Sequence, residues 1–188
     1  MQIRPFRVLA AVAALSLALG AGASAVQAST VTVGGAPMYS QKNIIQNAVN
    51  SKDHTTLVAA VKAAGLVDTL EGPGPFTVFA PTNAAFDKLP PGTVNTLLQP
   101  DNKATLTKIL TYHVVPGRLT AADIKAKIKA GGGKATLTTV SGGTLSASTV
   151  GSKLVLTDEK GGMSTVTIAN VLQSNGVIHV VDTVLLPN

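Results

Sequence analysis

The stretch "FTVFAPTNAAFDKLP", residues 76–90, predicts a strand, a tight corner and a short helix. Its first five residues favour β-structure and are apolar on both faces, which is typical of a central, buried strand. Pro81 cannot continue a hydrogen-bonded ladder because it has no backbone N–H. Thr82 or Asn83 can then cap a helix that begins with "AAFDKL". The segment therefore marks a place where a sheet meets a helix.

The same segment concentrates the large aromatic side chains of the chain. Phe76, Phe79 and Phe86 are the three phenylalanines expected in the mature protein, and they fall within eleven residues. Phe76 and Phe79 leave opposite faces of the strand, whereas Phe86 shares a helix face with Leu89. Burial of each ring contributes about 1.5–3 kcal/mol. We expect the three rings to pin the helix onto the sheet.

Helical patterns occupy the first part of the chain and strand patterns the last part. In the second predicted helix, Asp53 is placed to cap the start and Gly65 to end it. Helices are predicted within residues 43–50, 54–65, 91–99, 101–114 and 114–134. Strands are predicted at 134–140, 143–150, 152–158, 164–174 and 176–187. Helices first and strands last indicate one α+β domain rather than alternating βαβ units.

The N-terminus has the pattern of a secretory signal peptide. Arg4 and Arg7 precede a twelve-residue apolar run, and small residues lead to a cleavage position after Ala28. The run is short for a membrane anchor, which needs about 20 apolar residues. We therefore expect an exported protein, secreted or periplasmic, without a membrane span in its mature form. The predicted divisions are a signal peptide at 1–28, a flexible leader at 29–40 and a folded domain at 41–187.

Composition narrows the class of protein further. The chain has no cysteine, so neither disulfides nor a lipid-bearing cysteine can anchor or stabilise it. Without Arg4 and Arg7, 13 basic and 9 acidic side chains remain, a net charge near +4 that is dispersed along the chain. Such a charge can favour anionic polysaccharide or lipid head groups. It can equally serve only to keep the surface well solvated.

Sequence patterns for catalysis, metal binding and nucleic-acid binding are missing. The chain has three histidines and two glutamates, without HExxH or a nucleophile elbow in its mature part. "AGGGKA", residues 130–135, has the wrong glycine spacing for a phosphate loop and is interpreted as a helix-ending turn. Aromatic residues are too few for a nucleic-acid stacking platform. We expect a protein that is not an enzyme and that has no cofactor and no metal; a catalytic triad assembled only by the fold remains the alternative.

Three motifs together resemble the fasciclin (FAS1) domain. They are "TVFAPTNAAF" (77–86), "YHVVPG" (112–117) and "NGVIHVVDTVLLP" (175–187), which stand in the order and spacing of that family's two boxes and its intervening Tyr-His motif. The chain is similar to bacterial secreted, single-domain fasciclin-like proteins. The resemblance implies a wedge-shaped β-sandwich with several helices packed along one side. It also implies that the two boxes form neighbouring central strands.

The resemblance carries implied roles to particular residues. Tyr112 and His113 match a motif linked to adhesion in animal members, although their apolar flanks are equally typical of a core helix end. His113 and His179 are interpreted as partly buried side chains, hydrogen-bonded to the backbone or to a nearby polar group, rather than as catalytic or ligand-binding residues. Structural roles are implied for the box residues Phe76, Phe79, Pro81, Thr82, Asn83, Phe86, Asn175, Gly176, His179 and Asp182.

The function implied by the resemblance is adhesion or surface association through protein or glycan contacts, without catalysis. The partner would be a surface protein, a polysaccharide or another copy of the chain. Animal members often carry an Asp-Ile pair just before the second box, and this chain has Asn170 and Val171 there, so integrin-type recognition is not expected. The alternative is a carrier that binds a small apolar ligand, such as a carotenoid, in a cleft beside the sheet.

Overall fold

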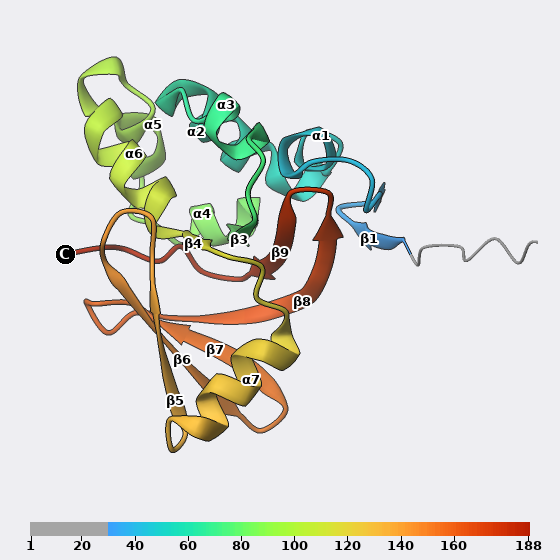
Figure 1. Cartoon of the computed structure of the whole chain (residues 1–188). Coiled ribbons are helices and arrows are strands. Elements are labelled where there is room, and N and C mark those ends of the chain that lie inside the picture. The colour runs from blue at the N-terminus through green and yellow to red at the C-terminus, as the bar shows by residue number, and fades with distance from the viewer. Residues whose placement is uncertain (1–29) are drawn as a thin grey trace, which may run out of the picture.

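The computed structural model describes residues 30–188, which form a group of helices, a two-stranded sheet and a seven-stranded sheet (Figure 1). Helices precede most strands along the chain, so the α+β prediction is confirmed. Helices α1–α6 gather on one side of the central strands, and α7 lies at the far end of the molecule. The predicted signal peptide at 1–28 lies outside the described residues.

The helical side consists of short helices joined by tight turns. Gly65 ends α2 in the left-handed conformation with a φ of 71°, as predicted. Asp53 does not cap α2, because a turn of 3-10 helix, Lys52–His54, intervenes. The α-helices on this side are α1 Ile44–Ala48, α2 Thr55–Ala64, α3 Val67–Glu71, α4 Asn83–Asp87, α5 Thr93–Leu97 and α6 Lys103–Tyr112.

The sheet places the two sequence boxes side by side. Strands β3 (Phe76–Pro81) and β9 (Gly176–Val181) pair in parallel, with Phe79 opposite His179. All six residues of β9 are buried, as are five of the six in β3, so both are interior strands. The strand order is β4-β3-β9-β8-β7-β6-β5, in which the others are β4 Val114–Pro116, β5 Lys134–Thr138, β6 Thr144–Val150, β7 Lys153–Thr157 and β8 Met163–Gln173.

The sheet bends until its two edges approach one another. Strand β8 is irregular opposite β9, with register shifts on both sides of Ile168, and such bulges bend a strand. Beyond β5, the Val140 N–H donates to the Val114 carbonyl on β4 at 2.8 Å. Helix α7 (Ala121–Ala130) packs against β5 and β6 through Ile124 and Ile128. The result is a barrel-like wedge closed at one end by a helix.

Two apolar cores lie on opposite faces of β3 and β9. Phe76, Phe86 and Ile178 belong to the core under the helices α1–α6. Phe79 and Val181 belong to the core inside the bent sheet, which α7 covers. The opposite directions predicted for Phe76 and Phe79 are therefore confirmed, and the phenylalanine-rich segment connects both cores.

The structure corrects three details of the sequence-based prediction. Residues 29–40 were expected to form a flexible leader, but β1 (Val31–Val33) and β2 (Ala36–Met38) form a hairpin that buries Val33 and Met38 in the helical core. Residues at the start of the predicted helical range 114–134 instead form β4, Val114–Pro116, at the sheet edge. The last strand ends at Val181 rather than continuing to 187.

Candidate functional site

The first box braces two helices through its polar residues. Thr82 caps α4, because its Oγ1 accepts a hydrogen bond from the Ala85 N–H at 3.2 Å. The Asn83 Oδ1 accepts from the Thr56 N–H at 3.0 Å, and its Nδ2 donates to the Lys52 carbonyl at 2.9 Å. Asn83 therefore satisfies the start of α2, the role that sequence reasoning assigned to Asp53. Pro81 stands directly before this corner and is the last residue of β3.

The second box begins with a residue that joins three elements. Asn175 lies in the turn between β8 and β9, where its Oδ1 accepts from the Ile44 N–H at 3.1 Å. Its Nδ2 donates to the carbonyls of Leu70 and Gly72 at 2.7 and 2.9 Å. The following Gly176 lies so close to β3 that a Cβ there would stand 2.1 Å from the Phe76 carbonyl oxygen. The Asn175 side chain therefore links the start of β9 to α1 and α3, and Gly176 allows β9 to approach β3 closely.

Replacing Asn175 by alanine should lower the free energy of unfolding by about 2 kcal/mol, because one N–H and two carbonyls lose their partner in a buried place. Chemical denaturation of the variant and the parent measures this change. Ser174→Ala serves as the matched control, since the neighbouring Ser174 side chain is exposed. An alanine variant as stable as the parent would contradict this role.

His179 is enclosed between the bent sheet and the segment before α7. Its Nε2 donates to the Leu119 carbonyl at 2.8 Å, and its ring stacks on Phe79 with 5.6 Å between the centroids. The Asn170 N–H stands 3.4 Å from its Nδ1, which is a weak acceptor contact. Burial lowers the pKa of His179, and the Leu119 carbonyl opposes that shift. The ring is therefore a neutral bridge inside the protein, with neither nitrogen free for chemistry.

Asp182 lies within the second box, directly after β9, and is a half-buried connector. Its Oδ1 accepts from the Thr165 N–H on β8 at 2.9 Å and from the hydroxyl of Thr183 at 3.0 Å. Its backbone carbonyl accepts a hydrogen bond from the Nζ of Lys88, which follows the last residue of α4. The carboxylate thus joins β8 to the segment after β9.

Tyr112 lies in the interior of the bent sheet, with 0% of its surface exposed. Its Oη donates to the Thr144 carbonyl at 2.6 Å and accepts from the Glu159 N–H at 3.1 Å. Burial raises its pKa to about 12, opposed in part by the Glu159 N–H. The side chain connects the end of α6 to β6 and to the turn after β7.

His113 ends α6 and is enclosed on every side. Its Nδ1 donates to the Ile109 carbonyl at 2.8 Å, and its Nε2 accepts from the Leu185 N–H at 3.0 Å. Burial lowers its pKa to about 4, and the Ile109 carbonyl and the charge of Asp158 oppose that shift. Tyr112 and His113 therefore hold the segment after β9 and the bent sheet against α6. Neither side chain can contact another molecule unless the surrounding segments of the chain move apart.

Replacing Tyr112 by phenylalanine should lower the free energy of unfolding by about 1–2 kcal/mol, because the Thr144 carbonyl and the Glu159 N–H lose their buried partner. The ring itself keeps its packing. Thermal or chemical denaturation measures the stability, and binding to cells and matrix is measured on the same sample. Binding lost while the fold persists would contradict a purely structural role for this hydroxyl.

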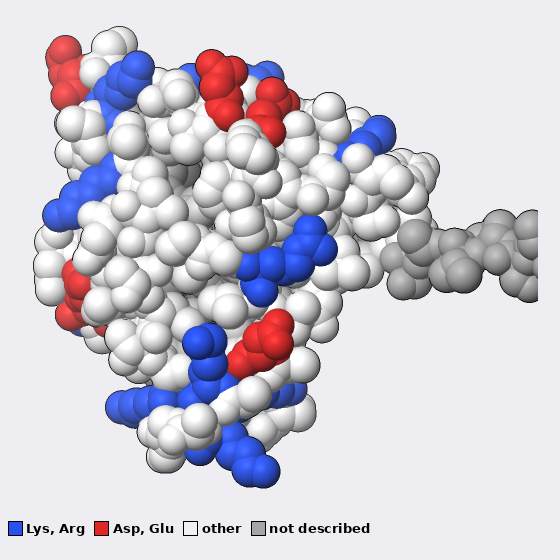
Figure 2. All heavy atoms as spheres, viewed as in Figure 1, with Lys and Arg blue, Asp and Glu red and all other residues white. Residues whose placement is uncertain are grey.

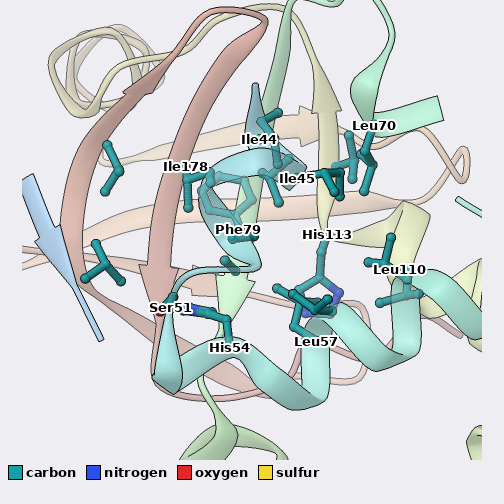
Figure 3. A pocket seen from close by; sticks show the side chains of 18 of the residues that line it. Ile44, Ile45, Ser51, His54, Leu57, Leu70, Phe79, Leu110, His113 and Ile178 are labelled. Atoms are coloured by element: carbon teal, nitrogen blue, oxygen red, sulfur yellow. Dashed lines mark hydrogen bonds between the residues drawn. The ribbon is translucent and has the colours of Figure 1, made fainter. Parts of the chain in front are cut away.

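A cavity of about 40 Å³ lies between the helices and β3, lined almost entirely by apolar side chains (Figure 3). Ile44, Leu57, Leu110 and Ile178 are among the residues around it. The polar residues around it are Ser51, His54 and His113, and the His54 Nδ1 stands 2.8 Å from the Ser51 Oγ. The His54 Nε2 is buried without a hydrogen-bond partner among residues 30–188. Burial lowers the pKa of His54, and the Ala80 carbonyl and the charge of Asp53 oppose that shift. In the sequence His54 was only one of three histidines, and no spacing marked it as part of a cavity.

The described residues offer little for catalysis or metal binding. Between residues 30 and 188, no three His, Asp or Glu side chains lie close enough to hold a metal ion. His113 and His179 already use their ring nitrogens in hydrogen bonds to the backbone. In the same range, no helix has the length and apolar character needed to cross a bilayer.

Comparisons with known proteins agree with this architecture. The family model described as Fasciclin domain matches residues 52–187. Protein sll1483 of Synechocystis sp. is 48% identical over 149 residues, which cover 79% of this chain and 75% of that protein. Immunogenic protein MPB70 of Mycobacterium bovis is 37% identical over 153 residues, 79% of this chain and 70% of that protein. A FAS1 domain pair from the insect cell adhesion molecule fasciclin I superposes with a TM-score of 0.69 at 20% identity, over 77% of this chain and 51% of that chain. The expected FAS1 fold is therefore confirmed.

Proposed function

This chain belongs to the fasciclin family, and on that premise we propose that it works outside the cytoplasm as a non-enzymatic module for adhesion or surface association. The observation that carries the proposal is the family match over residues 52–187. The insect protein whose domain pair shares this fold is a cell adhesion molecule. The scarcity of free catalytic groups among the described residues supports the non-enzymatic part.

The binding surface of this module lies on the outside of the scaffold rather than at the Tyr-His motif. Tyr112 and His113 are buried, and their polar atoms are bonded to the backbone. At the position of the acidic residue that serves integrin adhesion in animal members, the Asn170 Oδ1 instead accepts from the Ala121 N–H at 2.7 Å. Its neighbour Val171 is buried. We therefore propose a surface protein, a polysaccharide or a second copy as the partner, met through an exposed face.

Binding of the purified protein to cells, matrix proteins and surface polysaccharides tests this proposal. The expected result is saturable attachment to at least one of these surfaces, kept by Tyr112→Phe as long as that variant is folded. Hydrodynamic measurement of the free protein shows whether it also binds itself. A folded protein that attaches to none of a broad panel would contradict the proposed function.

A second candidate function is a carrier of a small apolar ligand such as a carotenoid. The cavity beside β3 favours it, because most of its lining side chains are apolar. A volume of about 40 Å³ holds only a few water-sized groups, so a carotenoid would require α1 and α2 to move away from the sheet. Carrier function predicts uptake of pigment, seen as visible absorption, and its loss in Val61→Phe, which fills the cavity. If Val61→Phe took up as much pigment as the parent, the pigment would not bind in this cavity.

A further inference from the structure

The positive charge of the described chain is concentrated in one part of the fold. Residues 118–157 contain six of the 13 Lys and Arg that remain without Arg4 and Arg7, and only one of the nine Asp and Glu. This part therefore carries 6 − 1 = +5, whereas the rest of residues 30–188 carries 7 − 8 = −1. The sequence showed the charge as dispersed, but the fold assigns the entire excess to α7 and strands β5–β7.

Five of these side chains meet at one end of the molecule. Helix α7, which carries three of these lysines, packs on β5 and β6, the strands next to Lys134 and to the turn from β6 to β7. The Lys125 Nζ donates to the Ser152 carbonyl in that turn at 3.3 Å. Figure 2 shows Lys and Arg side chains gathered over this narrowing end. We name the exposed set Lys125, Lys127, Lys129, Lys134 and Lys153 the lysine tip.

The two remaining charges of this part do not belong to the tip. Arg118 donates through Nη2 to the Gln173 carbonyl at 2.7 Å and so holds the end of β8. Asp123 accepts from the Thr120 N–H and hydroxyl in the capping box at the opposite end of α7. The acid lies about one turn before Lys127, whose charge helps to lower the pKa of Asp123, and about two turns from Lys129. Lys127 therefore has an acidic neighbour, and the net charge of residues 118–157 remains +5.

The chemistry of the lysine tip favours a flat anionic surface. Lysines are flexible, hydrated point charges that fit no rigid acceptor pattern. No aromatic residue occurs between 118 and 157, so sugar rings find no stacking platform there. Val150, which is 65% exposed, stands at the same turn and can enter a lipid head-group layer. We propose that the lysine tip binds bilayers rich in anionic phospholipid. This inference rests on the proposed surface association and identifies the surface as a lipid bilayer.

Vesicle co-sedimentation with the full chain tests this proposal. The variant Lys125→Gln/Lys127→Gln/Lys129→Gln removes three tip charges, and Lys52→Gln/Lys62→Gln/Lys103→Gln removes three exposed charges elsewhere as the matched control. The N-terminus is identical in all three proteins, so any membrane affinity of residues 1–29 cancels. Circular dichroism and thermal unfolding verify that each variant is folded.

The parent should bind phosphatidylcholine vesicles that contain phosphatidylglycerol and should bind pure phosphatidylcholine far more weakly. Each tip lysine near an anionic bilayer is worth about a fivefold change in partitioning, so the triple tip variant should bind about a hundredfold more weakly. The control variant should lose far less affinity for these vesicles. Raising the ionic strength several-fold should release the parent protein from them. A tip variant that binds like the parent, or a parent without preference for anionic lipid, would overturn the proposal.

Other outcomes separate this inference from the function on which it rests. Binding to acidic polysaccharide that depends on the tip, without vesicle binding, overturns the lipid assignment. Attachment to cells or matrix that the tip variant retains, again without vesicle binding, leaves the adhesive function standing and removes the lipid contact. Vesicle binding without attachment to any cell or matrix supports the lipid contact and contradicts the proposed adhesion.

Discussion

Replacing Phe79 by alanine should lower the free energy of unfolding by about 3–5 kcal/mol. The ring is 0% exposed in the core inside the bent sheet, and it stacks on His179 of the neighbouring strand. Its removal takes away apolar burial and leaves a void between β3 and β9. Since whole domains are stabilised by about 5–15 kcal/mol, much of the population is expected to unfold near physiological temperature.

Urea denaturation followed by circular dichroism measures the effect. Phe76→Ala is the matched control on the same strand, because Phe76 is only partly buried at the edge of the other core. Phe76→Ala should lower the free energy of unfolding by clearly less than Phe79→Ala does. Phe79→Leu retains most of the apolar volume and should fall between the parent and the alanine variant. A Phe79→Ala protein with the parent's urea midpoint would show that this ring is not a core residue.

Acidification should destabilise the protein, because burial lowers the pKa of all three described histidines. His113 has a pKa of about 4 in the folded protein against an ordinary value of 6.5, because burial disfavours its charged form. The unfolded chain therefore binds a proton that the folded one excludes between these two values. The contribution of neutral His113 to the free energy of unfolding is fully present above about pH 6.5 and is lost as the pH falls towards 4. A gap from 6.5 to about 4 is worth about 3 kcal/mol.

The other two histidines act in the same direction. Burial also lowers the pKa of His54 and of His179, so each adds to the loss on acidification. Asp123 and Glu159 have pKa values lowered by hydrogen bonds from Thr120 and Thr144, and their contributions disappear only at a still lower pH. The range between about pH 5 and 6.5 therefore reports on the histidines.

Denaturant midpoints at several pH values between about 5 and 7.5 measure this dependence. His113→Gln is the informative variant: it should be less stable at neutral pH, yet its stability should vary less with pH. Lys62→Gln, an exposed change on α2, should leave the pH slope unchanged. An unchanged slope in His113→Gln would mean that this ring is not the buried, neutral group described here.

The sequence was most informative where local pattern and burial agree. Strands β3 and β9 were predicted because they are apolar on both faces, which only interior strands tolerate, and they pair directly. The start of α2 was assigned to the wrong residue, because its cap, Asn83, lies 27 positions away from Thr56 in the chain. The hairpin β1–β2 was missed for a similar reason, since its stability comes from burying Val33 and Met38 under helices that follow later.

The candidate site shows the same division between local and tertiary information. The motif of Tyr112 and His113 was visible in the sequence, but its burial depends on β6, the turn after β7 and Leu185. The lysine tip was invisible, because alternating lysines on one helix form no stripe until β5 and the β6–β7 turn are placed beside them. Charges from separate elements become a surface only in the folded chain.

The central claim is that the two sequence boxes form adjacent interior strands, whose buried residues build the scaffold and leave its outer faces for binding. Proton NMR of the labelled protein tests this most directly, through nuclear Overhauser effects between the Phe79 and His179 rings, whose centroids lie 5.6 Å apart. Adjacent interior strands should give these cross-peaks, together with slow exchange of the β9 amide protons. Their absence, combined with a Phe79 ring open to solvent, would contradict it.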